Sequence, residues 1–158
     1  MASKVKAGGI IRNEHLATIG VMSAPDRCGL ACDVLRGLAQ RDINVEFIVQ
    51  CVDLEKNSHI VLCVREENLE AALGLLKPLQ SMLQAKDITY QRNMAVMSVF
   101  GPDFRERPAI AASVFESMAS AGISISAIST SISTVSCLID GAQVEEAIVS
   151  LREHFDLP

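Results

Sequence analysis

The chain has 158 residues with a formal net charge of −5, and 49% of its residues are hydrophobic while 21% are charged. This composition is typical of a globular protein and excludes a chain that is disordered throughout. The negative charge weighs against nucleic acid or an anionic membrane as partner, because both are bound through basic surface.

The first half of the chain predicts the element order β-α-β-β-α-β. Residues 16–22 are rich in β-forming side chains and end at a breaker segment that contains Pro25. Between residues 30 and 41 apolar side chains recur at helical spacing, which predicts a helix with one buried face. The remaining elements are expected to be strands at 45–52 and 59–64 around a polar turn at 53–57, a helix at 66–83 that Pro78 kinks or ends early, and a strand at 88–91.

The second half repeats this order. Residues 28–50 align without a gap against residues 108–130, and their apolar positions coincide, which indicates two similar structural units. The elements expected in the second copy are a strand at 94–100, a helix at 109–121, strands at 123–131 and 135–139, and a helix at 143–154.

The second copy lacks a closing strand, because residues 155–158 are too few to form one. The N-terminal segment 5–11 is a spare strand candidate that can complete the second sheet. The sequence therefore predicts a first domain at 14–92, inserted in a second domain at 93–158 that the N-terminal strand 5–12 completes.

The remaining residue types favour neither a metal site nor a catalytic site. The five cysteines form no C-x-x-C pair and sit in apolar, periodic surroundings, so we expect buried thiols of a reducing compartment. His15, His59 and His154 lie in unrelated segments and are expected at the surface, and the charged loop 105–107 is expected to be solvated. The amino terminus lacks an apolar signal core and no apolar run approaches the ~20 residues that cross a bilayer, so we expect a cytoplasmic protein.

Three segments resemble the tandem ACT-domain regulatory region of aspartokinases. Residues 21–31, VMSAPDRCGLA, are similar to the strand–loop–helix signature V-P-D-x-P-G-x-A of that family. Residues 43–50, INVEFIVQ, and residues 122–131, GISISAISTS, resemble its I-N-V/I-x-x-I-x-Q and G-I-N-I-x-x-I-S-T-S strands. The resemblance implies an α+β fold of two ferredoxin-like βαββαβ ACT domains in tandem, with helices on one face of each antiparallel sheet and the N-terminal strand completing the second domain.

The resemblance also implies an amino-acid site at the seam between paired ACT domains, where the first loop meets the helix start. Helix N–H groups near Gly29 suit an α-carboxylate. Asp26 suits an α-ammonium group, or alternatively caps the helix. Gln50 and Thr130 offer neutral hydrogen-bonding groups. The implied effector-binding residues are Asp26, Arg27, Cys28, Gly29, Leu30, Ala31, Asn44, Gln50, Ser124, Ile125, Thr130 and Ser131.

The sequence departs from the family pattern at three positions. Cys28 replaces a proline, and Ser124 replaces a common asparagine. Ile132 follows the S-T-S run where lysine-sensitive members commonly carry glutamate. A buried ammonium group needs a counter-charge, so lysine recognition is disfavoured in the second domain, and the first domain is expected to hold the more credible site.

The resemblance implies a regulatory module that gives feedback control by L-threonine and/or L-lysine within lysine, threonine and methionine biosynthesis. It implies no cofactor, a homodimer formed by ACT–ACT pairing, and an aspartokinase catalytic subunit or domain as partner. We do not expect the chain itself to be an enzyme, because no nucleophile, base or metal constellation can be assembled. A free-standing ACT-domain amino-acid sensor acting on another partner is an alternative, and so is a dimerisation scaffold without a ligand.

Overall fold

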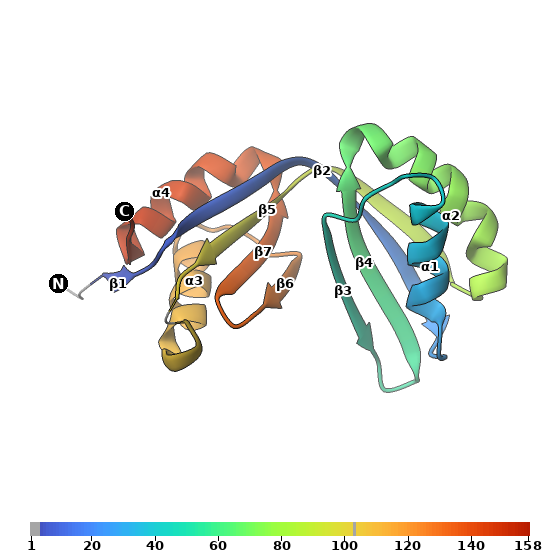
Figure 1. Cartoon of the computed structure of the whole chain (residues 1–158), viewed down its shortest axis with the longest axis horizontal. Helices are drawn as coiled ribbons and strands as arrows, with labels where there is room; N and C mark the ends of the chain where they lie inside the picture. Colours follow the sequence, from blue (N-terminus) through green and yellow to red (C-terminus); the bar gives the residue numbers. More distant parts are fainter. Residues whose placement is uncertain (1–3, 103) are drawn as a thin grey trace. The chain divides into compact units, whose positions relative to one another are not determined.

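The computed structural model describes residues 4–102 and 104–158, which divide into two compact units (Figure 1). The inserted unit comprises residues 15–93, and the split unit joins the N-terminal segment up to Glu14 to residues 94–158. Two long strands, β2 (Gly9–Pro25) and β5 (Asp87–Phe100), contribute residues to both units.

The inserted unit is an antiparallel sheet with two helices. Its strands follow the order β3-β4-β2-β5, and β4 pairs antiparallel with both β3 and β2. In Figure 1, α1 and α2 cover one face of this sheet. Besides β2 and β5, its elements are α1 (Leu30–Ala39), β3 (Phe47–Val52), β4 (Asn57–Arg65), the 3-10 turn η1 (Glu66–Asn68) and α2 (Leu69–Leu83).

The split unit repeats this arrangement with the strand order β2-β5-β7-β6. A separate two-stranded parallel sheet pairs β1 (Val5–Lys6) with β8 (Phe155–Asp156). Besides these strands, its elements are the 3-10 turn η2 (Phe104–Glu106), α3 (Ala109–Ser120), β6 (Ala127–Thr130), β7 (Thr134–Asp140), the 3-10 turn η3 (Gly141–Gln143) and α4 (Val144–His154).

Each core forms where the apolar face of the strands packs against the apolar faces of the two helices. Alternate residues of the strands face the helices because side chains alternate across a strand, while the helices supply residues three and four apart. In the inserted unit these buried residues include Ala17, Ile19 and Val21 of β2, Ile60 and Leu62 of β4, Val34 and Leu38 of α1, and Leu69, Ala72 and Leu76 of α2. In the split unit they include Ala95, Met97 and Val99 of β5, Cys137 and Ile139 of β7, Val114 and Met118 of α3, and Ala147 and Leu151 of α4.

The N-terminal strand differs from the expectation of a single strand at 5–12. The chain makes a short strand at Val5–Lys6 and re-enters strand structure at Gly9. Gly9 has φ 156°, and a Cβ atom there would lie 3.0 Å from the Phe100 ring, so this break requires glycine. As expected, residues 155–158 add no strand to the main sheet, but Phe155 and Asp156 form the short strand β8, which pairs with β1 in a separate sheet.

Two further expectations need correction. The strands expected separately at 88–91 and 94–100 are one strand, β5, which continues through Asn93 although that residue is in the left-handed region with φ 54°. Helix α2 ends at Leu83 as expected, and of the two roles considered for Pro78 an early end of the helix is wrong. Leu76 and Leu83 are both buried, so packing on either side of Pro78 compensates for the hydrogen bond that proline cannot donate.

The cysteines are all free, but only two of them are buried as expected. Burial raises the pKa of the Cys63 thiol to about 12 and that of Cys137 to about 11. Cys28, Cys32 and Cys51 are exposed, because they precede α1, face outward from it, or point away from the core on β3. Within the described residues, no helix combines the length and apolarity needed to span a membrane.

The packing of α2 predicts a contrast between two substitutions on one helix. Leu76→Ala should lower the free energy of unfolding by ~2–5 kcal/mol, because it leaves a cavity in the core. Met82→Ala, at a side chain 57% exposed, should change it by less than ~0.5 kcal/mol. Urea unfolding followed by circular dichroism measures both, and equal losses would contradict this packing.

Candidate functional site

In the inserted unit, an exposed loop joins the end of β2 to the start of α1. Gly29 occupies the N-cap position in the left-handed region, with φ 90°, and no side chain caps the helix. Asp26 therefore does not serve as the cap, which was the alternative role for it. Its backbone N–H donates to the carbonyl of Lys56 at 2.9 Å, and its exposed carboxylate has no hydrogen-bond or ion-pair partner among the residues that the structure describes.

The start of α1 offers donors for an anion. The backbone N–H groups of Ala31 and Cys32 meet no acceptor within the described part of the chain, as is usual for the first turn of a helix. The Arg27 guanidinium lies in the same place, where Nη2 contacts Oδ2 of Asp33 at 2.7 Å. The Leu30 side chain is buried in the core, so this residue can meet a ligand only through its backbone. A carboxylate bound here would compete with Asp33 for Arg27.

The sheet register brings Gln50 to this end of the unit and leaves Asn44 at the other. Gln50 pairs with Ile60, which in turn pairs with Val21 near the end of β2. Its side-chain amide donates to Ser58 Oγ at 2.7 Å. Asn44 instead follows the C-terminal end of α1, where its amide donates to Glu46 Oε1 at 3.2 Å. The structure thus groups Gln50, but not Asn44, with the loop before α1.

In the split unit, the corresponding loop and strand enclose a hollow of about 160 Å³. Thr130 and Ser131, from the end of β6, face Arg107 and the first turn of α3 across it. Ser124 and Ile125 lie at the opposite end, before β6, and Ile125 packs partly against the core. Sequence reasoning did not place Arg107 at this site; the available signal was its position directly before a helix.

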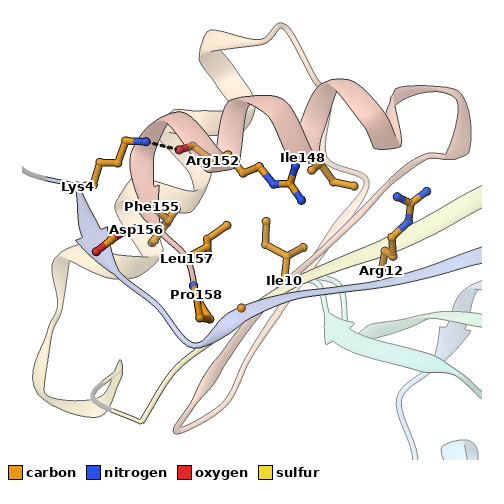
Figure 2. Close-up of a pocket in the computed structure, with 10 residues that line it drawn as sticks. Lys4, Ile10, Arg12, Ile148, Arg152, Phe155, Asp156, Leu157 and Pro158 are labelled. Atoms are coloured by element: carbon orange, nitrogen blue, oxygen red, sulfur yellow. Dashed lines mark hydrogen bonds between the residues drawn. The ribbon is translucent and has the colours of Figure 1, made fainter.

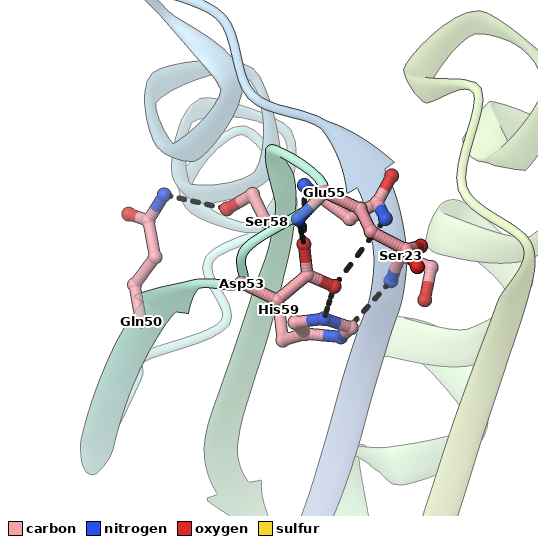
Figure 3. A network of polar contacts seen from close by, with 7 residues as sticks. Ser23, Gln50, Asp53, Glu55, Ser58 and His59 are labelled. Atoms are coloured by element: carbon pink, nitrogen blue, oxygen red, sulfur yellow. Dashed lines mark hydrogen bonds and ion pairs between the residues drawn. The ribbon is translucent and has the colours of Figure 1, made fainter.

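A polar network at the β3–β4 hairpin adjoins the loop of the inserted unit (Figure 3). Asp53 Oδ1 accepts the backbone N–H groups of Glu55 and Asn57, both at 2.9 Å. Its Oδ2 lies 3.0 Å from His59 Nε2, and the Ser23 N–H donates to His59 Nδ1 at 3.2 Å. Because Nδ1 is the acceptor, Nε2 carries the hydrogen and donates to Asp53.

This network holds the end of β2 against the hairpin, three residues before Asp26. The bond from His59, followed by the backbone N–H of Asn57, lowers the pKa of Asp53 to about 2. Sequence reasoning treated 53–57 as a plain turn and His59 as a surface residue, but the His59 ring is half-buried in this network. Across residues 4–102 and 104–158, no three His, Cys, Asp or Glu side chains gather where they could hold a metal ion.

Comparison with protein families gives one match in each unit. Residues 17–83 and residues 97–155 each match a model described as ACT domain. The aspartokinase of Mycolicibacterium smegmatis is 28% identical over 151 residues, which cover 94% of this chain and 36% of the relative. The chain therefore spans little more than a third of the length of such relatives.

Solved structures agree along almost the whole chain. The ligand-free regulatory subunit of aspartate kinase from Thermus thermophilus has a TM-score of 0.86 at 27% identity, and the alignment covers 95% of this chain and 99% of that one. Aspartate kinase from Synechocystis has a TM-score of 0.89 at 27% identity, with 95% of this chain and 27% of that chain covered.

The hairpin network predicts a specific acid response. The folded-state pKa of Asp53 lies below its usual value of 3.8, so ionised Asp53 stabilises the fold above about pH 4, and this contribution is lost as the pH falls toward about 2. Urea midpoints measured across this range should fall less steeply for Asp53→Asn than for the unmodified chain. Asp87→Asn, at an exposed position of β5, is the control and should keep the steep fall. Superimposable profiles for all three proteins would contradict the role of Asp53.

Proposed function

Because the chain belongs to the ACT-domain family, with one ACT domain in each unit, we propose that it is the amino-acid-binding regulatory module of an aspartokinase. One observation carries the proposal: in both units a loop and an uncapped helix start meet the end of a strand that bears neutral polar side chains. The likeness to a regulatory subunit of aspartate kinase over nearly its whole length supports the same assignment.

The residues at the inserted unit's loop suit the two charged groups of an α-amino acid. Arg27 and the free N–H groups of the first turn of α1 bind the carboxylate, and Asp26 binds the ammonium group. Gln50 lies at the same end of the sheet and can meet a polar side chain. In the split unit, Arg107 and the start of α3 take the corresponding role toward the carboxylate.

We favour L-threonine over L-lysine as the effector. Thr130 and Ser131 can exchange hydrogen bonds with a threonine hydroxyl in the split unit's hollow. None of the described residues that line this hollow is acidic, and Ile132 beyond it is 67% exposed, so a lysine ammonium group would lack a counter-charge there.

We also assign the edge strands to a homodimer. β3 and β6 stand at the ends of the strand order, with unpaired backbone groups on their outer sides. Apolar side chains are exposed along both: Ile48, Val52 and the hairpin residue Leu54 at β3, and Ile128 and Ile132 at β6. Pairing with a second copy would cover these residues and place two loops at one seam. Effector binding there would shift the equilibrium of a catalytic partner between two states.

A thermal-shift screen of the twenty amino acids tests the effector site. L-threonine at about a hundredfold excess over its Kd should stabilise the chain by ~2.7 kcal/mol and raise the Tm by several degrees. Asp26→Asn should reduce this shift, because it removes the ammonium partner at the inserted unit's loop while the split unit's hollow is unchanged, and the control Asp87→Asn should retain the full shift. A shift produced only by an unrelated amino acid would overturn the assignment of L-threonine.

The same screen separates a kinase regulator from a free-standing sensor when it is joined to an activity measurement. In the complex with its catalytic partner, L-threonine should lower the rate of aspartate phosphorylation. Threonine binding that leaves this rate unchanged would favour a sensor acting on another partner.

The edge-strand dimer predicts a contrast between two exposed valines. Val52→Lys places a charge on β3 and should weaken self-association by about tenfold or more, because a buried lysine would lose its hydration. Val149→Lys, at a similarly exposed position on α4, should leave it unchanged. Sedimentation equilibrium measures both, and equal effects would show that β3 is not the interface.

A further inference from the structure

The split unit contains a second, larger hollow, which shares no lining residue with the hollow formed by Arg107, the start of α3 and the end of β6. Its volume is about 550 Å³, within the range of small-molecule sites. Three segments line it: residues between Lys4 and Arg12, helix α4, and the residues after α4 (Figure 2). Nothing in the ACT-domain assignment accounts for it.

Cationic side chains converge on this hollow. The Arg12 guanidinium is held by Glu14, from Nε at 2.6 Å, and by Glu145, from Nη2 at 2.7 Å, which leaves Nη1 free of both. The Arg152 guanidinium extends along α4 toward Ile148 (Figure 2) and makes no ion pair with the described residues. Lys4 Nζ donates to the carbonyl of Arg152 at 2.7 Å and has two further N–H groups.

The polarity of helix α4 explains only part of this cluster. Cations near a helix C-terminus complement its dipole, and the bond from Lys4 to a last-turn carbonyl fits that role. Arg12, however, lies on β2 and its two glutamates fix it at the hollow. The Arg152 side chain bonds no carbonyl in the described ranges, so capping does not account for its position.

The floor of the hollow is apolar. Ile10 and Leu157 line it below the Arg152 guanidinium, and Ile148 lies beside that group (Figure 2). Asp156 is the one acidic residue among the described lining residues, against Lys4, Arg12 and Arg152. Glu14 and Glu145 already offset the charge of Arg12, so Arg152 is the lining guanidinium without an acidic partner among the described residues. This unpaired guanidinium favours an anion, and the floor favours one that carries a short apolar body.

We propose that this hollow binds a small aliphatic carboxylate, with Arg152 holding the carboxylate and Ile10, Ile148 and Leu157 contacting the aliphatic chain. The planar fork of Arg152 suits a carboxylate in a bidentate geometry. An α-ammonium group beside the ligand carboxylate would lie near the Arg152 guanidinium, so we expect the site to bind a plain carboxylate more tightly than the matching amino acid. This preference separates it from the proposed effector site, and the proposal does not depend on the identity of the effector.

Hexanoate tests the proposal, with 1-hexanol, L-norleucine and inorganic phosphate as matched probes. In the full chain with labelled isoleucine methyl groups, hexanoate should shift the NMR signals of Ile10 and Ile148, while Ile19 and Ile60 in the inserted unit stay unchanged. Arg152→Gln should weaken hexanoate binding about tenfold or more, and Arg152→Lys less, because a charged hydrogen-bonded pair is lost or only reduced. Arg41→Gln, an exposed arginine of the inserted unit, is the control.

Each probe has an outcome that would overturn the proposal. If 1-hexanol binds as tightly as hexanoate, the hollow binds through apolar contacts alone. If phosphate binds more tightly than hexanoate, the hollow is a site for inorganic anions. Equal or tighter binding of L-norleucine would make it an amino-acid site. The absence of any shift at Ile10 and Ile148 would show that the hollow does not take a carboxylate.

Discussion

The alternation of side chains along β2 and β5 is the constraint on which the rest of the fold depends. Each of these strands must present apolar residues to one core near one end and to a second core near the other. At the change from one unit to the next, each strand contains a non-glycine residue in the left-handed region, His15 with φ 58° and Asn93 with φ 54°. The inserted unit takes its four strands from the contiguous segment 15–93, whereas the split unit needs the N-terminal part of β2 to complete its sheet.

The sequence predicts the elements whose residues follow a clear period. Helices α1 and α3 and strands β4 and β7 were predicted within a few residues, because their apolar positions recur at spacings of 3.6 or 2. The continuity of β2 could not be predicted, because the polar run RNEH before Leu16 has the composition of a break. The extension of α2 past Pro78 also depends on buried leucines, whose packing is a tertiary property.

The candidate sites, too, could be predicted only where a local sequence pattern marks them. The loop before α1 could be found from its local pattern, and so could Gln50 and Thr130 at the strand ends. The one local signal for Arg107 is its position just before a helix, and the hairpin network needs Ser23, Asp53 and His59 to meet across two strands. The hollow beside α4 combines residues from both ends of the chain, so no sequence window contains it.

The two units share one arrangement of strands and helices but differ in the loop before the first helix and in the turn between the last two strands. In the inserted unit an exposed loop carries Asp26 and Arg27, and the longer β3–β4 hairpin is tied to the end of β2 through His59. In the split unit the β6–β7 turn is shorter, and the loop before α3 instead lines a hollow of about 160 Å³ with Arg107. The repeated fold thus offers two candidate sites that differ in charge.

The start of each first helix has a further consequence for regulation. Gly29 before α1 and Pro108 before α3 provide no side-chain oxygen, whereas Asp140 accepts the N–H of Ala142 at the turn that leads into α4. A ligand carboxylate at either helix start would perform the task of the missing cap, which is worth ~1 kcal/mol in ordinary helices. The effector would then be a structural component of the domain that binds it, and its departure would loosen the first turn of the helix. A partner would respond to the bound or the free site through this change in local order, and no hinge motion or sliding of one layer over another would be required.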